Sequence, residues 1–307
     1  MEYDAAEYEK ARAHFEEALA EQKRLTNGHD NLETAAIYNA LGMAAGALAD
    51  YDGAIEGFRN ALVIYDENGP EESNADLAMM NNNLAIVLFR QGKYDAALRG
   101  YEKALAVKEK VLGKEHPDTA GSYLGIANVY YAQKEYGQAL EWHKKALAAK
   151  EKALGKEHPD TASSYNNIAV VYAEQREYDQ ALEWHKKALA VKEKVLGTEH
   201  PSTAASYNNI ANVYYAQKEY GQALEWHKKA LAVREKVLGT EHPDTAASYN
   251  NIGEVYCAQG RHDEAKCYYD KALAIFSRAF DESHPYVQEV RRNLALLEAA
   301  RGSSAPG

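Results

Sequence analysis

Residues 197–238 read GTEHPSTAASYNNIANVYYAQKEYGQALEWHKKALAVREKVL, and this stretch decides the fold. It differs from residues 113–154 at only 8 of 42 positions. Its His-Pro dipeptide returns every 42 residues, at His116, His158, His200, His242 and His284. Strict periods of roughly 20 to 50 residues are typical of stacked arrays, in which each repeat buries its apolar face against its neighbours. The sequence therefore predicts a solenoid instead of a closed globule.

The spacing of apolar residues predicts two helices in each repeat. One stripe has helical spacing and consists of Tyr207, Ile210, Ala211 and Tyr214. A second stripe consists of Ala223, Leu224, His227, Ala230 and Leu231. Each stripe needs a partner, and the short polar connection between them permits only an antiparallel neighbour. We therefore predict an all-α fold built from antiparallel helix pairs.

The same pattern extends over nearly the whole chain. We predict a single array over residues 1–301, which begins with a lone helix at 4–25 and ends with a closing helix at 285–301. Six helix pairs over residues 30–280 lie between them, at 30–48 with 51–67, 73–91 with 94–112, 116–133 with 136–154, 158–175 with 178–196, 200–217 with 220–238, and 242–259 with 262–280. Residues 302–307, GSSAPG, are predicted to form a flexible tail.

The junctions between repeats carry signals for helix ends. Gly197 and Gly239 follow the long second helices, where glycine is favoured because it readily adopts positive φ. Pro201 and Pro243 suit the first turn of the next helix, since that turn needs no N–H from its first residue. Small residues that would let the helices of a pair approach closely recur at one first-helix position: Gly42, Ala85, Ala127, Ala169, Ala211, Gly253 and Ala295.

The histidines do not have metal-ligand spacing. Those of the His-Pro dipeptides are one repeat apart, on the order of 10 Å or more, whereas zinc ligands lie about 2 Å from the ion. A second set, His143, His185 and His227, occupies a second-helix position that other repeats fill with Phe15, Phe58, Tyr101 and Tyr269. We expect this second set to pack between helices. The sequence predicts no metal site and no cofactor.

The repeat resembles the tetratricopeptide repeat at a set of matching positions: Tyr207, Ile210, Ala211, Tyr214, Tyr220, Ala223 and Ala230. Its 42-residue length, Leu-Gly-x-Glu-His-Pro junctions and Tyr-Asn-Asn-Ile segment make it similar to the repeats of kinesin light chains. The resemblance implies a right-handed superhelix whose first helices line a concave groove. It further implies a non-catalytic scaffold or adaptor that binds a peptide or disordered segment of another protein in that groove.

Asparagines recur on the side of the first helices that the apolar stripe leaves free. Asparagine is a mediocre helix former, so its repetition needs another reason. Its amide both donates and accepts, and can pair with the backbone of an extended peptide. Aromatic residues on the same side would supply apolar anchors. The predicted peptide-binding residues are Asn82, Asn83, Phe89, Asn128, Tyr131, Asn166, Asn167, Asn208, Asn209, Asn212, Tyr215, Asn250, Asn251 and Glu254.

A second interpretation of the asparagines is structural. The pair could have been copied passively with the repeat, or one asparagine of each pair could connect neighbouring repeats. Positions of the Asn209 type are favoured for that connection over positions of the Asn208 type. The repeat at 116–154 has Leu124 and Gly125 in place of the pair, which interrupts a continuous peptide track. Both interpretations are open at this point.

Composition limits the classes of partner and activity. The formal net charge of −11 disfavours nucleic acid and anionic membranes, and no apolar run reaches the roughly 18 residues needed to cross a bilayer. Cys257 and Cys267 are the only cysteines, which suggests a reducing compartment, so we expect a cytoplasmic protein. The sequence has no nucleophile with an adjacent base and no glycine-rich phosphate loop, so we expect no enzyme.

The expected partner is a protein or peptide segment, bound by a monomer of this chain. The alternative is a structural array that associates with copies of itself and has no peptide client. The near-identity of the repeats permits end-to-end stacking. Arg291, Arg292 and Glu298 instead give the closing helix the polar face of a cap.

Overall fold

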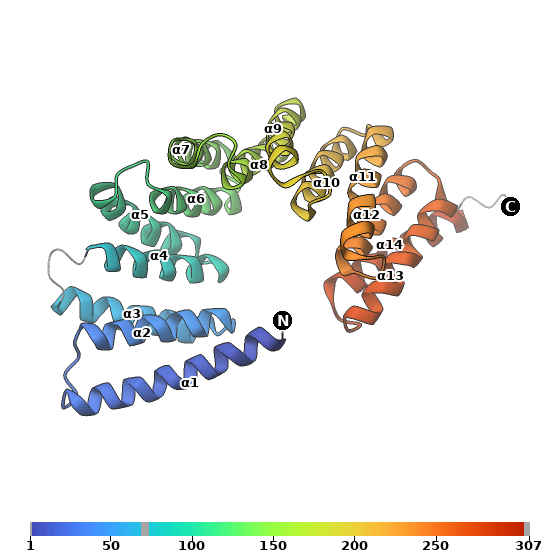
Figure 1. Ribbon diagram of the computed structural model, residues 1–307. Coiled ribbons are helices and arrows are strands. Elements are labelled where there is room, and N and C mark those ends of the chain that lie inside the picture. The colour runs from blue at the N-terminus through green and yellow to red at the C-terminus, as the bar shows by residue number, and fades with distance from the viewer. Residues whose placement is uncertain (1, 69–73, 304–307) are drawn as a thin grey trace. The chain divides into compact units, whose positions relative to one another are not determined.

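The computed structural model describes residues 2–68 and 74–303, which form 14 α-helices (Figure 1). In chain order they are α1 (Glu2–Leu25), α2 (Leu32–Ala47), α3 (Tyr51–Asn68), α4 (Asn74–Arg90), α5 (Tyr94–Val111), α6 (Pro117–Ala132), α7 (Tyr136–Leu154), α8 (Pro159–Glu174), α9 (Tyr178–Leu196), α10 (Pro201–Ala216), α11 (Tyr220–Leu238), α12 (Pro243–Ala258), α13 (His262–Ala279) and α14 (Pro285–Ser303). The predicted boundaries differ from these by at most two residues. The all-α prediction is confirmed.

The predicted tail at 302–307 differs from the structure at its start. Gly302 and Ser303 belong to the last turn of α14, so the closing helix is two residues longer than predicted. The rest of the predicted tail, residues 304–307, lies outside the described residues.

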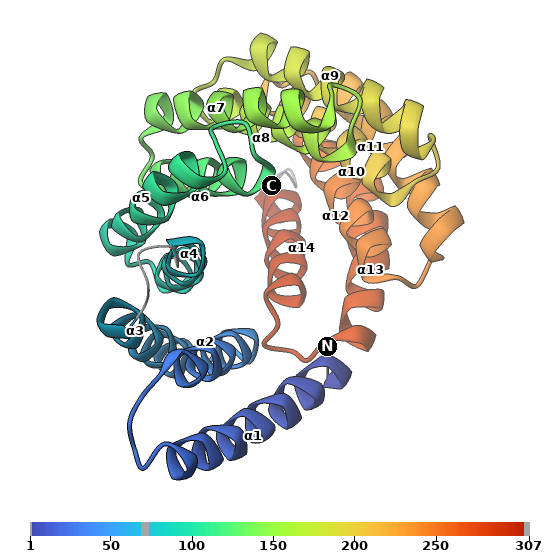
Figure 2. The same ribbon diagram turned by 60° about the vertical axis from the view of Figure 1, so that its left-hand side comes forward.

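The helices group into two compact units, Met1–Gly155 and Lys156–Gly307. Within the first unit, α2, α4 and α6 lie on one side and α3, α5 and α7 on the other (Figure 2). The second unit places α8, α10, α12 and α14 on one side and α9, α11 and α13 on the other. Each unit is therefore a row of antiparallel helix pairs. The continuity of one array over residues 1–301 stays a prediction.

The two apolar stripes of each repeat form the core. In α10, Ile210 and Ala211 are fully buried, and in α11 Ala223 and Ala230 are equally buried. Alanine at the contact lets the two helix axes approach closely, and larger neighbours fill the space around it. The stripes predicted from residues 197–238 are thus the surfaces along which the helices of a pair pack.

The small residues at the helix contact vary with the ring opposite them. A Cβ atom on Gly253 would lie 2.7 Å from the Tyr269 ring, and one on Gly42 would lie 2.8 Å from the Phe58 ring. Real Cβ atoms do not approach other atoms this closely, so glycine on the first helix makes room for these two rings. The repeat with Tyr101 differs, because it keeps Ala85 on the first helix and places Gly100 of the second helix against it. Where the second helix carries the smaller histidine, the first helix carries alanine.

The His-Pro dipeptide caps the first helices α6, α8, α10 and α12. His200 has extended backbone, and its Nδ1 accepts a hydrogen bond of 3.1 Å from the Ser202 N–H. The Thr203 hydroxyl, fully buried, donates to the Gly197 carbonyl at 2.8 Å. Gly197 itself has φ near +89°, which a side chain would disfavour. The Thr203 bond joins the end of one repeat to the beginning of the next, and the His200 bond caps the new helix.

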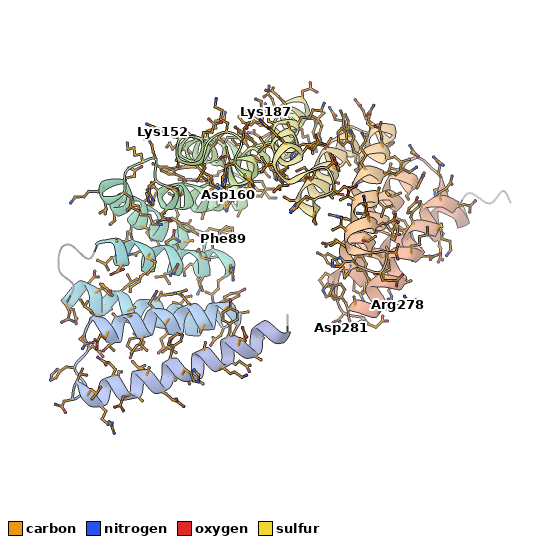
Figure 3. The ribbon with its side chains drawn as sticks, in the orientation of Figure 1. Phe89, Lys152, Asp160, Lys187, Arg278 and Asp281 are labelled. Carbon is orange, nitrogen blue, oxygen red and sulfur yellow. The ribbon has the colours of Figure 1, made fainter. Side chains whose placement is uncertain are left out.

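The exposed sides of the second helices carry ion pairs. Glu183 and Lys187 lie one turn apart on α9, with 2.7 Å between their charged atoms. Lys152, near the end of α7, pairs with Glu115 at the preceding junction, and Arg278 of α13 pairs with Glu241 in the same way. Figure 3 shows Lys152, Lys187 and Arg278 on their helices. This face is exposed to water, and exposed ion pairs of this kind contribute little to the free energy of unfolding.

Candidate functional site

The predicted peptide-binding residues all lie on first helices. We call the surface they form within each unit the first-helix face. In the first unit it comprises Asn82, Asn83 and Phe89 on α4, and Asn128 and Tyr131 on α6. In the second unit it comprises Asn166 and Asn167 on α8, Asn208, Asn209, Asn212 and Tyr215 on α10, and Asn250, Asn251 and Glu254 on α12.

Asparagine amides connect neighbouring repeats in the second unit. Asn209 Nδ2 donates to Asn166 Oδ1 at 2.8 Å, and Asn251 Nδ2 donates to Asn208 Oδ1 at 2.8 Å. The second asparagine of one repeat thus bonds to the first asparagine of the repeat before it. This is the connecting role that the second interpretation assigned to positions of the Asn209 type, and the first asparagine of each pair takes part as well.

The connecting bonds leave part of each amide available. Within the described part of the chain, no partner is recorded for the Nδ2 donors of Asn166 and Asn208 or for the Oδ1 acceptors of Asn209 and Asn251. All four side chains are half-buried. Each connected pair therefore still presents one amide donor and one amide acceptor on the first-helix face.

The amide of Asn250 is more fully engaged. Asn250 is 5% exposed, and its Nδ2 donates to Glu254 at 3.0 Å and to Glu289 at 3.5 Å. Its Oδ1 accepts from Asn293 at 3.1 Å, and Asn293 also donates to Glu254 at 3.2 Å. Burial raises the pKa of Glu254. This end of the face is a closed polar network and has less capacity for a ligand than the face around Asn208.

The first unit has a different arrangement because α6 lacks the asparagine pair. A Cβ atom at Gly125 would lie 2.5 Å from the Tyr101 ring, so an asparagine there would have to displace that ring. Asn82 accepts instead from the Ser122 hydroxyl at 3.3 Å. The Tyr101 ring of α5 therefore lies in the space beside Gly125, although Asn293 stands at the equivalent position after Tyr269.

The predicted aromatic anchors each pack against a tyrosine of their own repeat. The ring centroids of Phe89 and Tyr94 are 5.7 Å apart; Phe89 lies in the last turn of α4 (Figure 3). The corresponding distances are 5.8 Å for Tyr131 and Tyr136 and 5.6 Å for Tyr215 and Tyr220. In each pair the second ring begins the second helix. Of these residues, Tyr215 is 36% exposed, so it still presents surface to a ligand.

A pocket of about 470 Å³ opens between α8, α9 and α10. It is lined by Val170, Ala173, Glu174, Arg176, Tyr178, His185, Asn209, Asn212, Val213 and Ala216. Only Asn209 and Asn212 among these were predicted from the sequence. The signal that could have revealed the pocket is Ala173, because three equivalent positions hold the aromatic residues Phe89, Tyr131 and Tyr215, and a fourth holds Cys257.

Three histidines are buried between the helices, as predicted. His143, His185 and His227 are 2% to 3% exposed, and burial lowers the pKa of each to about 4. His227 Nδ1 lies 3.0 Å from Asn208 Oδ1. The Nδ1 atoms of His143 and His185 are buried without a hydrogen-bond partner.

Residues 2–68 and 74–303 contain no cluster of three His, Cys, Asp or Glu side chains that could hold a metal ion. Among the helices of those residues, none is both long enough and apolar enough to cross a membrane.

Comparison with known protein families matches the tetratricopeptide repeat at residues 1–67, 76–152, 120–194, 160–236, 202–278 and 244–305. Solved structures with similar folds include proteins with repeats of the kinesin-light-chain type. BtubC (BKLC) from P. vanneervenii is 26% identical, with 77% of this chain and 92% of that chain covered and a TM-score of 0.61. A putative kinesin light chain of Podosopora anserina, with nearly identical TPR-like repeats, is 28% identical, with 68% and 98% covered and a TM-score of 0.59.

A third solved structure extends the likeness at the level of fold alone. The apo form of RapI is 17% identical, with 88% of this chain and 99% of that chain covered and a TM-score of 0.61. Among curated proteins, no sequence matches this chain.

Proposed function

This chain belongs to the tetratricopeptide repeat family and is of the kinesin-light-chain-like type, and from that premise we propose that it is a non-catalytic scaffold for another protein. The ligand is a peptide or disordered segment that lies in extended form across the first-helix face. Scaffolds of this family typically serve as protein-interaction adaptors. The chain's net charge of −11 favours a protein ligand over nucleic acid.

The observation that carries the proposal is the unused half of each connected amide pair in the second unit. Asn166 and Asn208 keep a donor, and Asn209 and Asn251 keep an acceptor, at equivalent positions of successive repeats. An extended backbone presents C=O and N–H groups that can pair with both without regard to its side chains. Because the amides already bond to each other, their orientations are held in place before a ligand arrives, which lowers the entropic cost of binding.

The sharpest test begins with peptides selected from a random display library on the intact chain. Their dissociation constants are then compared for the native protein and for the double variant Asn166→Ala, Asn208→Ala. Loss of two amide donors should weaken binding by about tenfold or more. The matched control is Gln180→Ala with Gln222→Ala, which removes two exposed amides from the second helices of the same repeats. The control should change affinity less than twofold.

Stability must be followed in the same experiment because the asparagines also connect repeats. Each substitution removes an acceptor from a half-buried bond and should cost about 1 kcal/mol of the free energy of unfolding. Binding is therefore measured well below the unfolding transition, where both variants stay folded by circular dichroism. Failure to select any peptide, or equal weakening by the control, would contradict the proposal. Concentration-dependent light scattering without peptide binding would favour the self-assembling array.

A further inference from the structure

The pocket between α8, α9 and α10 corresponds to a position that three other repeats fill with their own aromatic side chain, while α12 carries Cys257 there. Phe89, Tyr131 and Tyr215 each place a ring 5.6 to 5.8 Å from a tyrosine that begins the second helix of their repeat. In the repeat of α8 and α9 that tyrosine is Tyr178, and the residue opposite is Ala173. Among the described residues, no aromatic ring packs against Tyr178 in the way that Tyr215 packs against Tyr220.

The backbone that presents Tyr178 matches that of its counterparts. The turn before it contains Arg176 at φ +62°, and the equivalent turns contain Lys134 and Lys218 at φ +63°. The second helix then begins at Tyr178, as the equivalent helices begin at Tyr136 and Tyr220. The missing ring therefore leaves an unfilled space of unchanged geometry.

We propose that this pocket binds an aromatic side chain, tyrosine foremost, supplied by the partner polypeptide. The incoming ring takes the place that Tyr131 and Tyr215 take in their own repeats and packs against Tyr178. Val170 and Ala173 line one side, and Val213 and Ala216 the other. A volume of about 470 Å³ lies within the range of sites that enclose small organic groups. The source of the ring rests on the proposed function, whereas the pocket's affinity for the ring does not.

His185 is one of the polar residues of the pocket, together with Glu174, Arg176, Asn209 and Asn212. It lines the pocket and is 2% exposed, yet its Nδ1 has no hydrogen-bond partner. A buried polar atom without a partner is costly, so a ligand that bonds to it gains affinity. The equivalent Nδ1 of His227 is already engaged with Asn208. A phenol hydroxyl can either donate or accept, and so can bond to this imidazole in either tautomer. This chemistry favours tyrosine over phenylalanine.

The test uses isolated side-chain probes and methyl NMR of the intact chain. N-acetyl-L-tyrosinamide, N-acetyl-L-phenylalaninamide and N-acetyl-L-leucinamide are titrated while the methyl signals of Val170 and Val213 are followed. The tyrosine probe should give saturable shifts with a dissociation constant in the millimolar range, as its size allows. It should bind about fivefold tighter than the phenylalanine probe, the effect of one hydrogen bond between neutral groups. The leucine probe should bind weakest.

Ala173→Tyr supplies the ring internally and should abolish the shifts. This variant should fold normally, because Tyr131 and Tyr215 occupy the same position in their repeats. The control is Ala190→Tyr, the same change at an exposed position of α9, which should leave probe binding unaltered. Absent shifts in the native protein, or equal shifts in Ala173→Tyr, would overturn the proposal.

The two proposals fail separately. In one outcome, selected peptides bind with an affinity that Ala173→Tyr does not change, and the probes do not bind. The aromatic pocket is then refuted and the scaffold function stands. If the tyrosine probe binds the native protein and no peptide can be selected, the pocket stands and the scaffold function fails.

Discussion

Burial changes the acid–base chemistry of three imidazoles in the helix contacts. His143, His185 and His227 sit at the contact between helices, where water is excluded and a positive charge would be poorly solvated. Lys192 near His185 and Arg234 near His227 add repulsion to the same effect. His143 is affected by burial alone. All three are therefore neutral in the folded protein at neutral pH.

Neutral burial of these histidines predicts a loss of stability on mild acidification. An unfolded histidine binds its proton near pH 6.5, whereas in the folded chain the pKa is about 4. Between these values the unfolded state holds more protons, so the free energy of unfolding falls as the pH falls. Each histidine should cost about 2 kcal/mol at pH 5 and nothing above pH 7. Urea unfolding at a series of pH values measures this.

The control for that prediction is a variant that copies a pair of packed residues from another repeat. His143→Phe combined with Ala127→Gly reproduces the arrangement of Phe58 with Gly42. This double variant should lose stability less steeply between pH 6.5 and pH 5 than the native protein. Identical slopes for the two proteins would mean that His143 does not contribute in this way.

At the scale of the helix, the fit between partners decides which residues are interchangeable. Glycine in a helix interior is ordinarily unfavourable by about 1 kcal/mol relative to alanine. Gly253 is nevertheless retained in α12, because the Tyr269 ring of α13 occupies the space of its missing Cβ. Packing therefore overrides helix propensity at this position.

We expect Gly253→Ala to destabilise the protein although the change favours the helix itself. The added methyl group must displace the Tyr269 ring, at a cost of about 1 to 3 kcal/mol. Adding Tyr269→His should restore most of the loss, because Ala211 with His227 is the same combination in the neighbouring repeat. Chemical denaturation of both variants measures the effect. Stabilisation by Gly253→Ala alone would show that the ring moves aside at no cost.

At the scale of the whole molecule, repeats contact mainly their sequence neighbours. Asn209 reaches back to Asn166, and Asn251 reaches back to Asn208, each across one repeat. The stability of such a chain is close to a sum of repeat terms and neighbour terms. No single closing contact of the second unit should be needed for the rest of that unit to fold.

Deletion of Thr198–Gly239, one complete 42-residue repeat, should therefore leave a folded protein. The new junction Gly197–Thr240 has the same sequence as the old one, and Asn251 would meet Asn166 in place of Asn208. Helix content per residue should be unchanged by circular dichroism, while the denaturant slope falls in proportion to the surface removed. A deleted chain with the spectrum of a random coil would show that the second unit folds only as a whole.

The helices were predictable because each of their determinants is local. Apolar spacing within residues 197–238 and the Gly and Pro residues at the junctions act over one or two turns, so the boundaries could be placed to within two residues. The contact of His227 with its helix partner was also predictable, since equivalent positions carry Phe or Tyr. The capping role of the His-Pro histidine was not predicted, because it depends on the backbone conformation at the junction.

The amino-acid pattern alone specifies the repeat: its length, its two helices, their antiparallel pairing and the face that carries asparagine. These follow from periodicity, which any copy of the repeat displays. Only the tertiary structure decided how the amides are used and where a ligand can enter. Asn209 and Asn166 are 43 residues apart, and the pocket over His185 exists because Ala173 is small while its neighbours hold their positions. Contacts and spaces of this kind depend on helices from neighbouring repeats, and no single repeat contains them.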